Sequence, residues 1–155
     1  SEARRWSKNK EEFGKGSIEG IAGAEAANNS ATGGAMVPTM VLRNKKPILV
    51  AGAPGGSVII SAVLQSIINI VDFKMSPVEA VTVPRIHCEG NGIHAEATVP
   101  TSTVSELKKM GHMVKHKPES FGMDMSMAHV IGIDENGEAR GGADPRAGGG
   151  LAYAF

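Results

Sequence analysis

A glycine turn between two apolar runs places the strongest constraint on the fold of this chain. The turn, Pro-Gly-Gly-Ser at 54–57, separates a strand-like run at 48–51 from an apolar run at 58–73. Paired glycines allow a tight reversal that other residues resist, so the pattern predicts a strand, a turn and the start of a buried helix. Backbone N–H groups at a helix start have no intrahelical partner and can bind a phosphate, a carboxylate or the oxyanion of an acyl-transfer intermediate.

The length and charge of the chain set broad limits. Its 155 residues suffice for one domain with a hydrophobic core, and its net charge of +0 implies no general attraction to nucleic acid or an anionic membrane. The single cysteine, Cys88, leaves no partner for an internal disulfide. The run 58–73 contains polar residues and is shorter than the roughly 20 residues of a membrane span, so we expect a core helix there, apolar nearly all round and buried on several sides. The polar residues 1–15 do not resemble a signal peptide.

Turn signals and helix signals together predict an α+β fold. Strand-like runs flank turns at 44–47, 90–92 and 135–137, which predicts three β-hairpins. Ser76 followed by Pro77 and Glu79 is a helix start, and Thr101 or Ser102 should cap a helix that runs to Met110. Residues 112–117 alternate like a strand. We therefore expect a mostly antiparallel sheet covered by helices.

Four motifs, in order, carry a family resemblance over about three-quarters of the chain. They are Pro-Thr-Met-Val-Leu at 38–42, Gly-Ala-Pro-Gly-Gly-Ser at 52–57, Glu-Ala-Val at 79–81 with Pro-Arg-Ile-His at 84–87, and Gly-Gly-Ala-Asp-Pro-Arg at 141–146. Residues 38–155 resemble the C-terminal part of the small subunit of γ-glutamyltransferases (γ-glutamyltranspeptidases). The resemblance implies part of an Ntn-hydrolase αββα sandwich, in which two sheets lie between helical layers.

The resemblance also implies a chemistry. In that family a precursor cleaves itself, and the new N-terminal Thr attacks a γ-glutamyl amide such as that of glutathione, with its own α-amine as base. The acyl group then passes to water or to an amino acid. A glycine pair supplies backbone N–H groups to the tetrahedral intermediate, and here that pair would be Gly55 and Gly56.

This sequence departs from the family pattern at three places. The nucleophile motif Thr-Thr-His is absent, and so is the Asn-Glu-x-x-Asp segment that binds the substrate α-amino group. Gly34 and Ala35 replace the two serines whose hydroxyls meet the substrate α-carboxylate, so the substrate-binding residues are unknown. We expect a chain that is inactive alone and binds a γ-glutamyl compound only where a further chain completes the site.

Residues 1–37 have a different character. They are first charged and then dominated by small residues, without an amphipathic period. Residues 1–39 resemble a segment of the large membrane subunit of tripartite tricarboxylate transporters, and the two resemblances meet at Pro38-Thr39. We expect a foreign or irregular segment at 1–37, a γ-glutamyltransferase-like domain at 38–155 and a join of two sequences between them.

Several isolated residues have both a functional and a structural interpretation. Ser1 could be an N-terminal nucleophile, although its context matches nothing in the family. Asp144 and Arg146 could bind a substrate carboxylate or fix a turn, and Arg85 has the same two interpretations. Cys88 fits a buried strand cysteine better than a catalytic thiol.

The histidines and methionines have such alternatives as well. The five histidines are scattered, and His112 and His116 lack a third ligand, so no metal is expected. Met123, Met125 and Met127 alternate at period two, which favours core or edge packing over a partner surface.

The functional expectation is therefore γ-glutamyl acyl transfer or hydrolysis in the intact family, without a cofactor. One alternative is a non-catalytic binding module that self-associates as a homo-oligomer through uncovered sheet. A transporter fragment is the other, and it rests on the N-terminal segment alone. The expectation includes no nucleic acid and no membrane span, and the compartment stays open between bacterial periplasm and cytoplasm.

Overall fold

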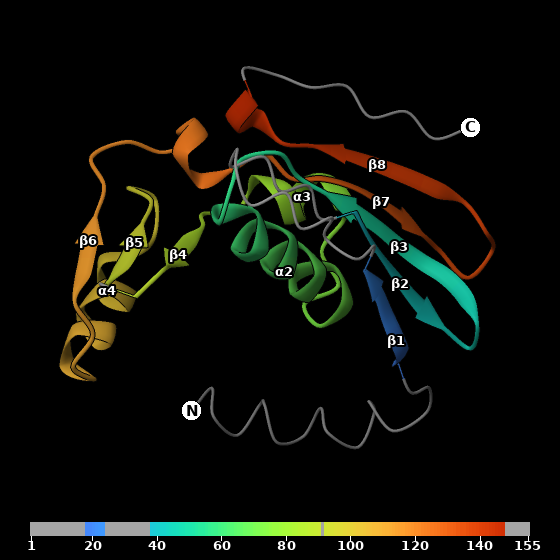
Figure 1. Cartoon of the computed structure of the whole chain (residues 1–155), viewed down its shortest axis with the longest axis horizontal. Helices are drawn as coiled ribbons and strands as arrows, with labels where there is room; N and C mark the ends of the chain where they lie inside the picture. Colours follow the sequence, from blue (N-terminus) through green and yellow to red (C-terminus); the bar gives the residue numbers. More distant parts are fainter. Residues whose placement is uncertain (1–17, 24–37, 91, 148–155) are drawn as a thin grey trace.

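Two β-sheets and their covering helices form the described part of the chain. The computed structural model describes residues 18–23, 38–90 and 92–147. The larger sheet has the strand order β1-β2-β3-β7-β8, and the smaller sheet has the order β4-β5-β6. Figure 1 shows the smaller sheet with α4 to one side of the larger sheet with α2 and α3. The expected α+β class is confirmed.

The bounds of the elements follow the chain order. The strands are β1 (Ile18–Gly23), β2 (Thr39–Arg43), β3 (Lys46–Gly52), β4 (Ile86–Cys88), β5 (Ile93–Ala95), β6 (Val114–His116), β7 (His129–Ile133) and β8 (Ala139–Ala143). The helices are α2 (Val58–Val71), α3 (Pro77–Thr82) and α4 (Thr101–Lys109), with short 3₁₀ turns η1 (Met123–Met125) and η2 (Pro145–Ala147).

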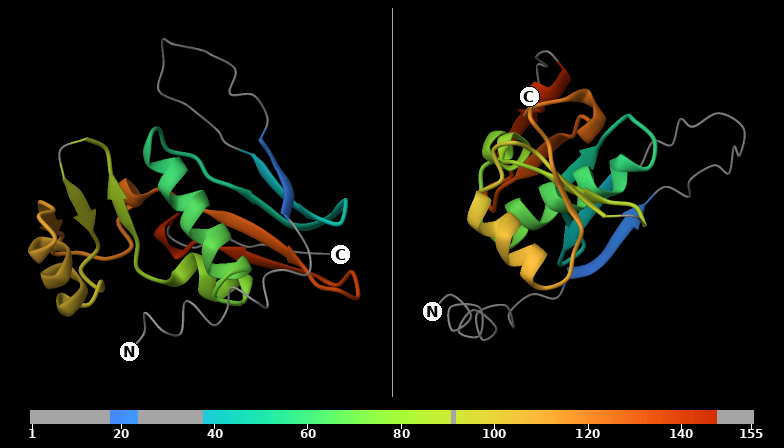
Figure 2. Two further views of the ribbon diagram at one scale, coloured as in Figure 1. Left: turned by 90° about the horizontal axis from the view of Figure 1, so that it is seen from below. Right: turned by 90° about the vertical axis from the view of Figure 1, so that its left-hand side faces the viewer.

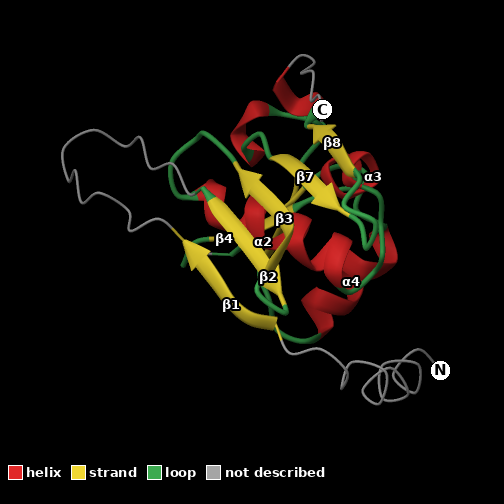
Figure 3. Cartoon of the chain, turned by 90° about the vertical axis from the view of Figure 1, so that its right-hand side faces the viewer, coloured by secondary structure: helices red, strands yellow, loops and turns green. Residues whose placement is uncertain are grey.

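All three predicted hairpins are present. The β2–β3 pair is closed by Asn44 and Lys45, which both adopt positive φ, at 51° and 61°. In the β7–β8 loop, Asp134 Oδ1 accepts hydrogen bonds from the N–H groups of Asn136 and Glu138, both at 2.9 Å. β4 pairs antiparallel with β5. At the edge of the larger sheet, β1 pairs antiparallel with β2 (Figure 3).

The core lies between the larger sheet and α2. Alternate residues of a strand point to one face, and the buried ones of β2, β3 and β7 face this helix. The buried cluster includes Val41, Leu49, Ala51 and Val130 from the strands and Ile59, Ala62, Val63 and Ile67 from α2. Figure 2 shows α2 lying across these strands. None of the described helices has the length and apolar character needed to cross a membrane.

Helix α2 is less enclosed than its sequence predicts. Ile60 and Leu64 are 65% and 50% exposed and lie one helical turn apart. The expectation of burial on several sides is therefore wrong for this stripe, because no described element packs over it. The predicted start and end of the helix are close to those observed.

Helix α3 begins with the predicted capping box. Ser76 Oγ accepts a hydrogen bond from the N–H of Glu79, and the Glu79 carboxylate accepts one from the N–H of Ser76 at 2.8 Å. Pro77 then packs so closely on β8 that a Cβ at Gly142 would collide with the carbonyl of Pro77. This close approach fixes α3 against the sheet.

Helix α4 corrects one prediction and explains a parallel pair. Pro100, rather than Thr101 or Ser102, occupies the N-cap, and it makes no side-chain cap because proline has no polar side-chain atom. The helix is the crossover from β5 to β6, which therefore pair parallel. The two ends of the segment 98–120, which contains α4 and β6, meet where Ser120 Oγ contacts the N–H and Oγ1 of Thr98 at 3.0 and 2.9 Å.

Candidate functional site

The predicted glycine turn joins β3 to the N-terminus of α2. Gly55 and Gly56 have φ of 121° and 68°, in the left-handed region where a side chain is strained. Among the described residues, none accepts a hydrogen bond from the N–H of Gly55 or of Gly56. Because these two donors lie at the positive end of the α2 dipole, the turn can bind a developing negative charge.

A buried serine fixes the start of this turn. Ser126, which is 1% exposed, donates a hydrogen bond from Oγ to the carbonyl oxygen of Pro54 at 2.6 Å. Its φ is 62°, unusual for a residue with a side chain, and this conformation places the hydroxyl beside Gly55. A neutral bond thus connects the turn to the loop that precedes β7.

Arg85 connects Ser126 to the C-terminal motif. Its Nη1 donates hydrogen bonds to the carbonyl oxygens of Met125 and Ser126, at 3.3 and 3.1 Å. Its Nη2 lies 2.6 Å from Asp144 Oδ2. Burial and the nearby charge of Arg146 lower the pKa of Arg85, while Asp144 opposes that shift. Arg85 therefore orders the backbone behind the turn.

Asp144, Arg146 and Glu96 complete a buried ionic network. Arg146 Nη2 lies 2.5 Å from Glu96 Oε2, and Arg146 Nη1 lies 3.0 Å from Asp144 Oδ1. Burial raises the pKa of Glu96, but the hydrogen bond and charge of Arg146 outweigh it, so the pKa is lowered. Burial lowers the pKa of Arg146, and the two carboxylates more than compensate. Two cations and two anions thus balance inside the protein.

This network supports the turn-fixing interpretation of Asp144 and Arg146. Arg146 donates through Nε, Nη1 and Nη2 to Glu96, Asp144 and the carbonyl oxygens of Val81 and Val83. These contacts use all five N–H groups of a guanidinium. Arg146 consequently has no donor left for a substrate carboxylate. Arg85 is also buried, at 2% exposure, and its guanidinium bonds backbone carbonyl oxygens and Asp144 rather than groups that face solvent.

A second set of polar side chains holds the far end of the turn. Ser57 Oγ donates to Glu89 Oε2 at 2.6 Å, and Glu89 Oε2 lies 3.6 Å from His87 Nε2. His87 Nδ1 lies 2.9 Å from Ser61 Oγ. The hydrogen bond from Ser57 is the main reason that the pKa of Glu89 is lowered.

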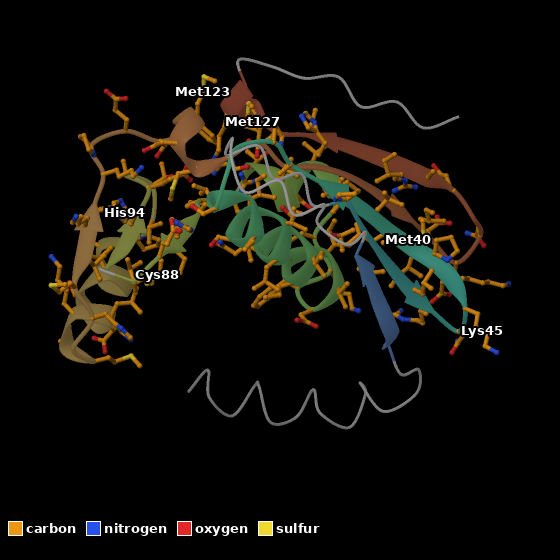
Figure 4. The ribbon with its side chains drawn as sticks, in the orientation of Figure 1. Met40, Lys45, Cys88, His94, Met123 and Met127 are labelled. Carbon is orange, nitrogen blue, oxygen red and sulfur yellow. The ribbon has the colours of Figure 1, made fainter. Side chains whose placement is uncertain are left out.

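These side chains border a cavity of about 320 Å³. It lies between the start of α2 and the small sheet, and its lining residues are Val58, His87, Glu89, His94, Lys117, Asp124 and Met125. Burial and the charges of Lys115, Lys117 and His87 lower the pKa of His94. Figure 4 shows His94 in the lobe of the small sheet.

Other sequence-based candidates fall outside this arrangement. Ser1, Gly34 and Ala35 lie outside the described residues. Cys88, predicted to be buried, is exposed, because β4 is the edge strand of a small sheet (Figure 4). His112 precedes β6, and His116 lies within it and contacts the carbonyl oxygen of Ala97.

The three spaced methionines lie in a 3₁₀ turn and in the connection that follows it. Met123 to Met125 form a 3₁₀ turn in which Met125 is buried and Met123 is 72% exposed. Figure 4 shows Met123 and Met127 in the connection that leads to β7. The preferred interpretation of core or edge packing is thus confirmed for Met125, whereas Met123 is exposed.

Sequence reasoning missed Glu96, Ser126 and Glu89. Glu96 and Ser126 are nearly fully buried polar residues, and their partners are distant in sequence. The only local signal was a carboxylate directly after the β5 strand, which had no neighbour to suggest an ion pair. Glu89 stands in a turn where an acidic residue is ordinary.

The strand–glycine turn–helix unit lies within an antiparallel α+β fold, and the solved structures that share this fold include gamma-glutamyltranspeptidases with the Ntn-hydrolase architecture. The model of the gamma-glutamyltranspeptidase family matches residues 27–154, and the chain belongs to this family. Solved structures agree. A Helicobacter pylori gamma-glutamyltranspeptidase mutant aligns with TM-score 0.65 and 35% identity over 86% of this chain and 74% of that one.

Curated relatives are much longer than this chain. The glutathione hydrolase proenzyme of Bacillus subtilis (strain 168) is 38% identical over 111 residues, which cover 70% of this chain and 18% of that protein. The glutathione hydrolase proenzyme of Escherichia coli (strain K12) is 33% identical over 135 residues, 84% of this chain and 22% of that protein. The chain spans about one-fifth of their length.

Proposed function

We propose that residues 38–155 contribute the oxyanion-binding half of a γ-glutamyl acyl-transfer site, and that the 155 residues do not turn over alone. The observation that carries this proposal is the positive-φ pair Gly55 and Gly56, with unbonded N–H groups at the start of α2. Donors of this kind stabilise the tetrahedral intermediate that forms when a nucleophile attacks an amide carbonyl. These 155 residues contain no Thr-Thr-His segment, so a nucleophile would have to come from outside them.

A graft tests the role of the glycine pair. Residues 38–155 would replace the matching C-terminal segment of the Bacillus subtilis proenzyme, and release of the chromogenic aniline from a γ-glutamyl anilide would be measured. We expect the graft to mature and to hydrolyse the substrate, and Gly56→Ala to lower kcat, because a Cβ strains the left-handed backbone at φ 68° and displaces the N–H groups that face the oxyanion. The 155-residue chain alone should release no aniline.

The matched control for this substitution is Gly137→Ala. Gly137 also has positive φ, at 85°, and no atom lies within 4 Å of an added Cβ, but it stands in the β7–β8 loop. It carries a comparable backbone strain away from the turn. The oxyanion proposal is wrong if the two grafts mature equally and have the same kcat, or if the isolated chain has turnover above background.

A second proposal is self-association through the face of the larger sheet that is turned away from α2 and α3. Met40, Val50 and Ile131 are register partners on neighbouring strands, so their side chains form one apolar row on this face. Light scattering of the chain should give a dimer that Ile131→Asp shifts toward monomer. Val78→Asp, at an exposed apolar position on α3, should leave the mass unchanged. A monomeric wild-type chain would contradict this proposal.

We also keep, as a proposal, that the N-terminal segment 1–37 was joined to the domain that follows. Its support is the resemblance of residues 1–39 to a transporter subunit, whereas the family match begins at residue 27 and so includes the end of this segment. The genomic sequence upstream of the first codon tests it. A reading frame rich in membrane spans would favour the join, and a frame containing Thr-Thr-His would refute it.

A further inference from the structure

The glycine turn is held at both ends by side chains that come from other parts of the chain. At its start, the Pro54 carbonyl accepts the buried Ser126 hydroxyl at 2.6 Å. At its end, the Ser57 hydroxyl donates to the Glu89 carboxylate, also at 2.6 Å. The first contact is neutral and enclosed, so it changes little with conditions. The second ends on an exposed charged group and can be altered by protonation.

Ser57 does not cap the helix that it precedes. Serine at an N-cap ordinarily accepts a hydrogen bond from a first-turn N–H and adopts extended backbone angles. Here Ser57 has helical angles, φ −65° and ψ −26°, and makes no side-chain cap bond, and no acidic residue stands in the first turn of α2. Since its hydroxyl is committed to Glu89, the Ser57 side chain caps none of the N–H groups of the first turn, where the N–H of Ile59 donates to the carbonyl oxygen of Gly56 at 3.3 Å.

Glu89 is itself positioned by neighbours on the small sheet. His87 lies two residues before it on β4, and its Nε2 is 3.6 Å from Glu89 Oε2. Ser61 fixes the other ring nitrogen of His87 from α2. The remaining ionisable groups that share the cavity with Glu89 are His94 on β5, Lys117 after β6 and Asp124 in η1. Lys117 and Asp124 pair with each other, which leaves Glu89 to Ser57 and His87.

We propose that Glu89 is a positioning residue for the Gly55–Gly56 turn, acting through Ser57 and in its ionised form. This proposal depends on the function proposed above only where it gives the turn a role in acyl transfer. An ionised carboxylate is the stronger acceptor, so it holds the Ser57 hydroxyl and fixes the turn. Once protonated, the carboxyl is a weaker acceptor, so it holds Ser57 less firmly and the turn is less fixed. The lowered pKa of Glu89 agrees with a bond that prefers the ionised form.

The test is a pH titration of the ¹⁵N-labelled chain, followed by the amide signals of Gly55 and Gly56. In the wild-type protein both signals should move in an acidic step whose midpoint lies below 4.5, the ordinary value for a glutamate. In Glu89→Gln the amide oxygen still accepts from Ser57 but cannot titrate. Its signals should stay near the wild-type positions at neutral pH, and the acidic step should be absent.

Two further variants separate positioning from general disturbance. Ser57→Ala removes the link while it keeps the carboxylate, so the acidic step should vanish and the Gly56 signal should shift at neutral pH. Glu106→Gln changes an exposed, ion-paired carboxylate on α4 and should leave the step intact.

Either of two results would overturn the proposal: glycine signals that do not titrate in the wild type, or a step that persists in both Glu89→Gln and Ser57→Ala. This readout needs no turnover, so it can fail or succeed independently of the graft experiment.

Discussion

Arg85 and Asp144 form an ion pair, 2.6 Å between Nη2 and Oδ2, in which both side chains are buried. Asp144 also accepts the backbone N–H of Ala128 at 2.8 Å, so the pair ties the start of β7 to the end of β8. Because Arg85 bonds the carbonyl oxygen of Ser126, the same pair stands directly behind the glycine turn.

Asp144→Asn should therefore be strongly destabilising. It removes one of two buried anions and leaves an uncompensated positive charge, which costs about 3–5 kcal/mol of unfolding free energy. Urea denaturation measures this loss. The control is Glu138→Gln, whose exposed pair with Arg140 should contribute less than about 1 kcal/mol. Equal losses in the two variants would mean that the buried ion pair contributes no more to the unfolding free energy than the exposed pair does.

Glu96 should make the stability of the chain depend on acid. Its pKa is lower in the folded protein than the ordinary 4.5, so its contribution is present above that value and is lost as the pH falls through the folded-state pKa. We expect wild-type unfolding free energy to decline more steeply below about pH 4.5 than that of Glu96→Gln.

The comparison isolates Glu96 from the other acidic groups. Glu79 and Glu89 also have lowered pKa values and remain in both proteins, so they contribute equally to each curve. Parallel curves for wild type and Glu96→Gln in urea melts at successive pH values would refute this prediction.

Gly142→Ala should disturb the contact between β8 and α3. An added Cβ would overlap the backbone of Pro77, and overpacking of this kind costs about 1–3 kcal/mol. Thermal unfolding would report the loss. Gly52→Ala adds the same methyl group to β3, where no atom lies within 4 Å, and should change the melting temperature little.

Lys45→Gly should stabilise the chain. Lys45 has φ of 61° in the two-residue loop between β2 and β3, a turn of the kind that favours Asn-Gly. Relief of the left-handed strain should add about 0.5–1 kcal/mol to the unfolding free energy, measured in urea. Lys46→Gly, one residue later in β3, should have the opposite sign, because glycine weakens a strand.

Features with a local cause could be predicted from sequence. The Ser76–Glu79 capping box and the Gly137 hairpin need only residues within a few positions of one another, and both are present. The glycine turn is predictable for the same reason, since it lies between a strand-like run at 48–51 and a helical apolar run at 58–73. The family motifs at 84–87 and 141–146 pointed to Arg85 and Asp144, but not to their pairing.

Features that depend on distant partners could not be predicted. Ser126 bonds Pro54 across 72 positions, and Arg146 bonds Glu96 across 50. Nothing near either residue indicates a buried partner. The parallel pairing of β6 with β5 depends on the path of α4, and the exposure of Ile60 depends on which elements are absent from its side of α2.

The closed base of the α4 segment has an evolutionary consequence. Thr98 meets Ser120, and the N–H of Phe121 bonds Glu96 at 3.2 Å, so the chain leaves and re-enters the fold at one point. The contacts at 98 and 120–121 close the loop between them, and because the entropy of loop closure grows slowly with length, each added residue costs little free energy. The segment is nevertheless anchored by β6, which pairs with β5, and by Val104, which packs with Ala95, so added length is tolerated best in the turn at 110–112 between α4 and β6. Insertions in that turn can change the outer surface of the protein while the ion network behind the glycine turn keeps its geometry.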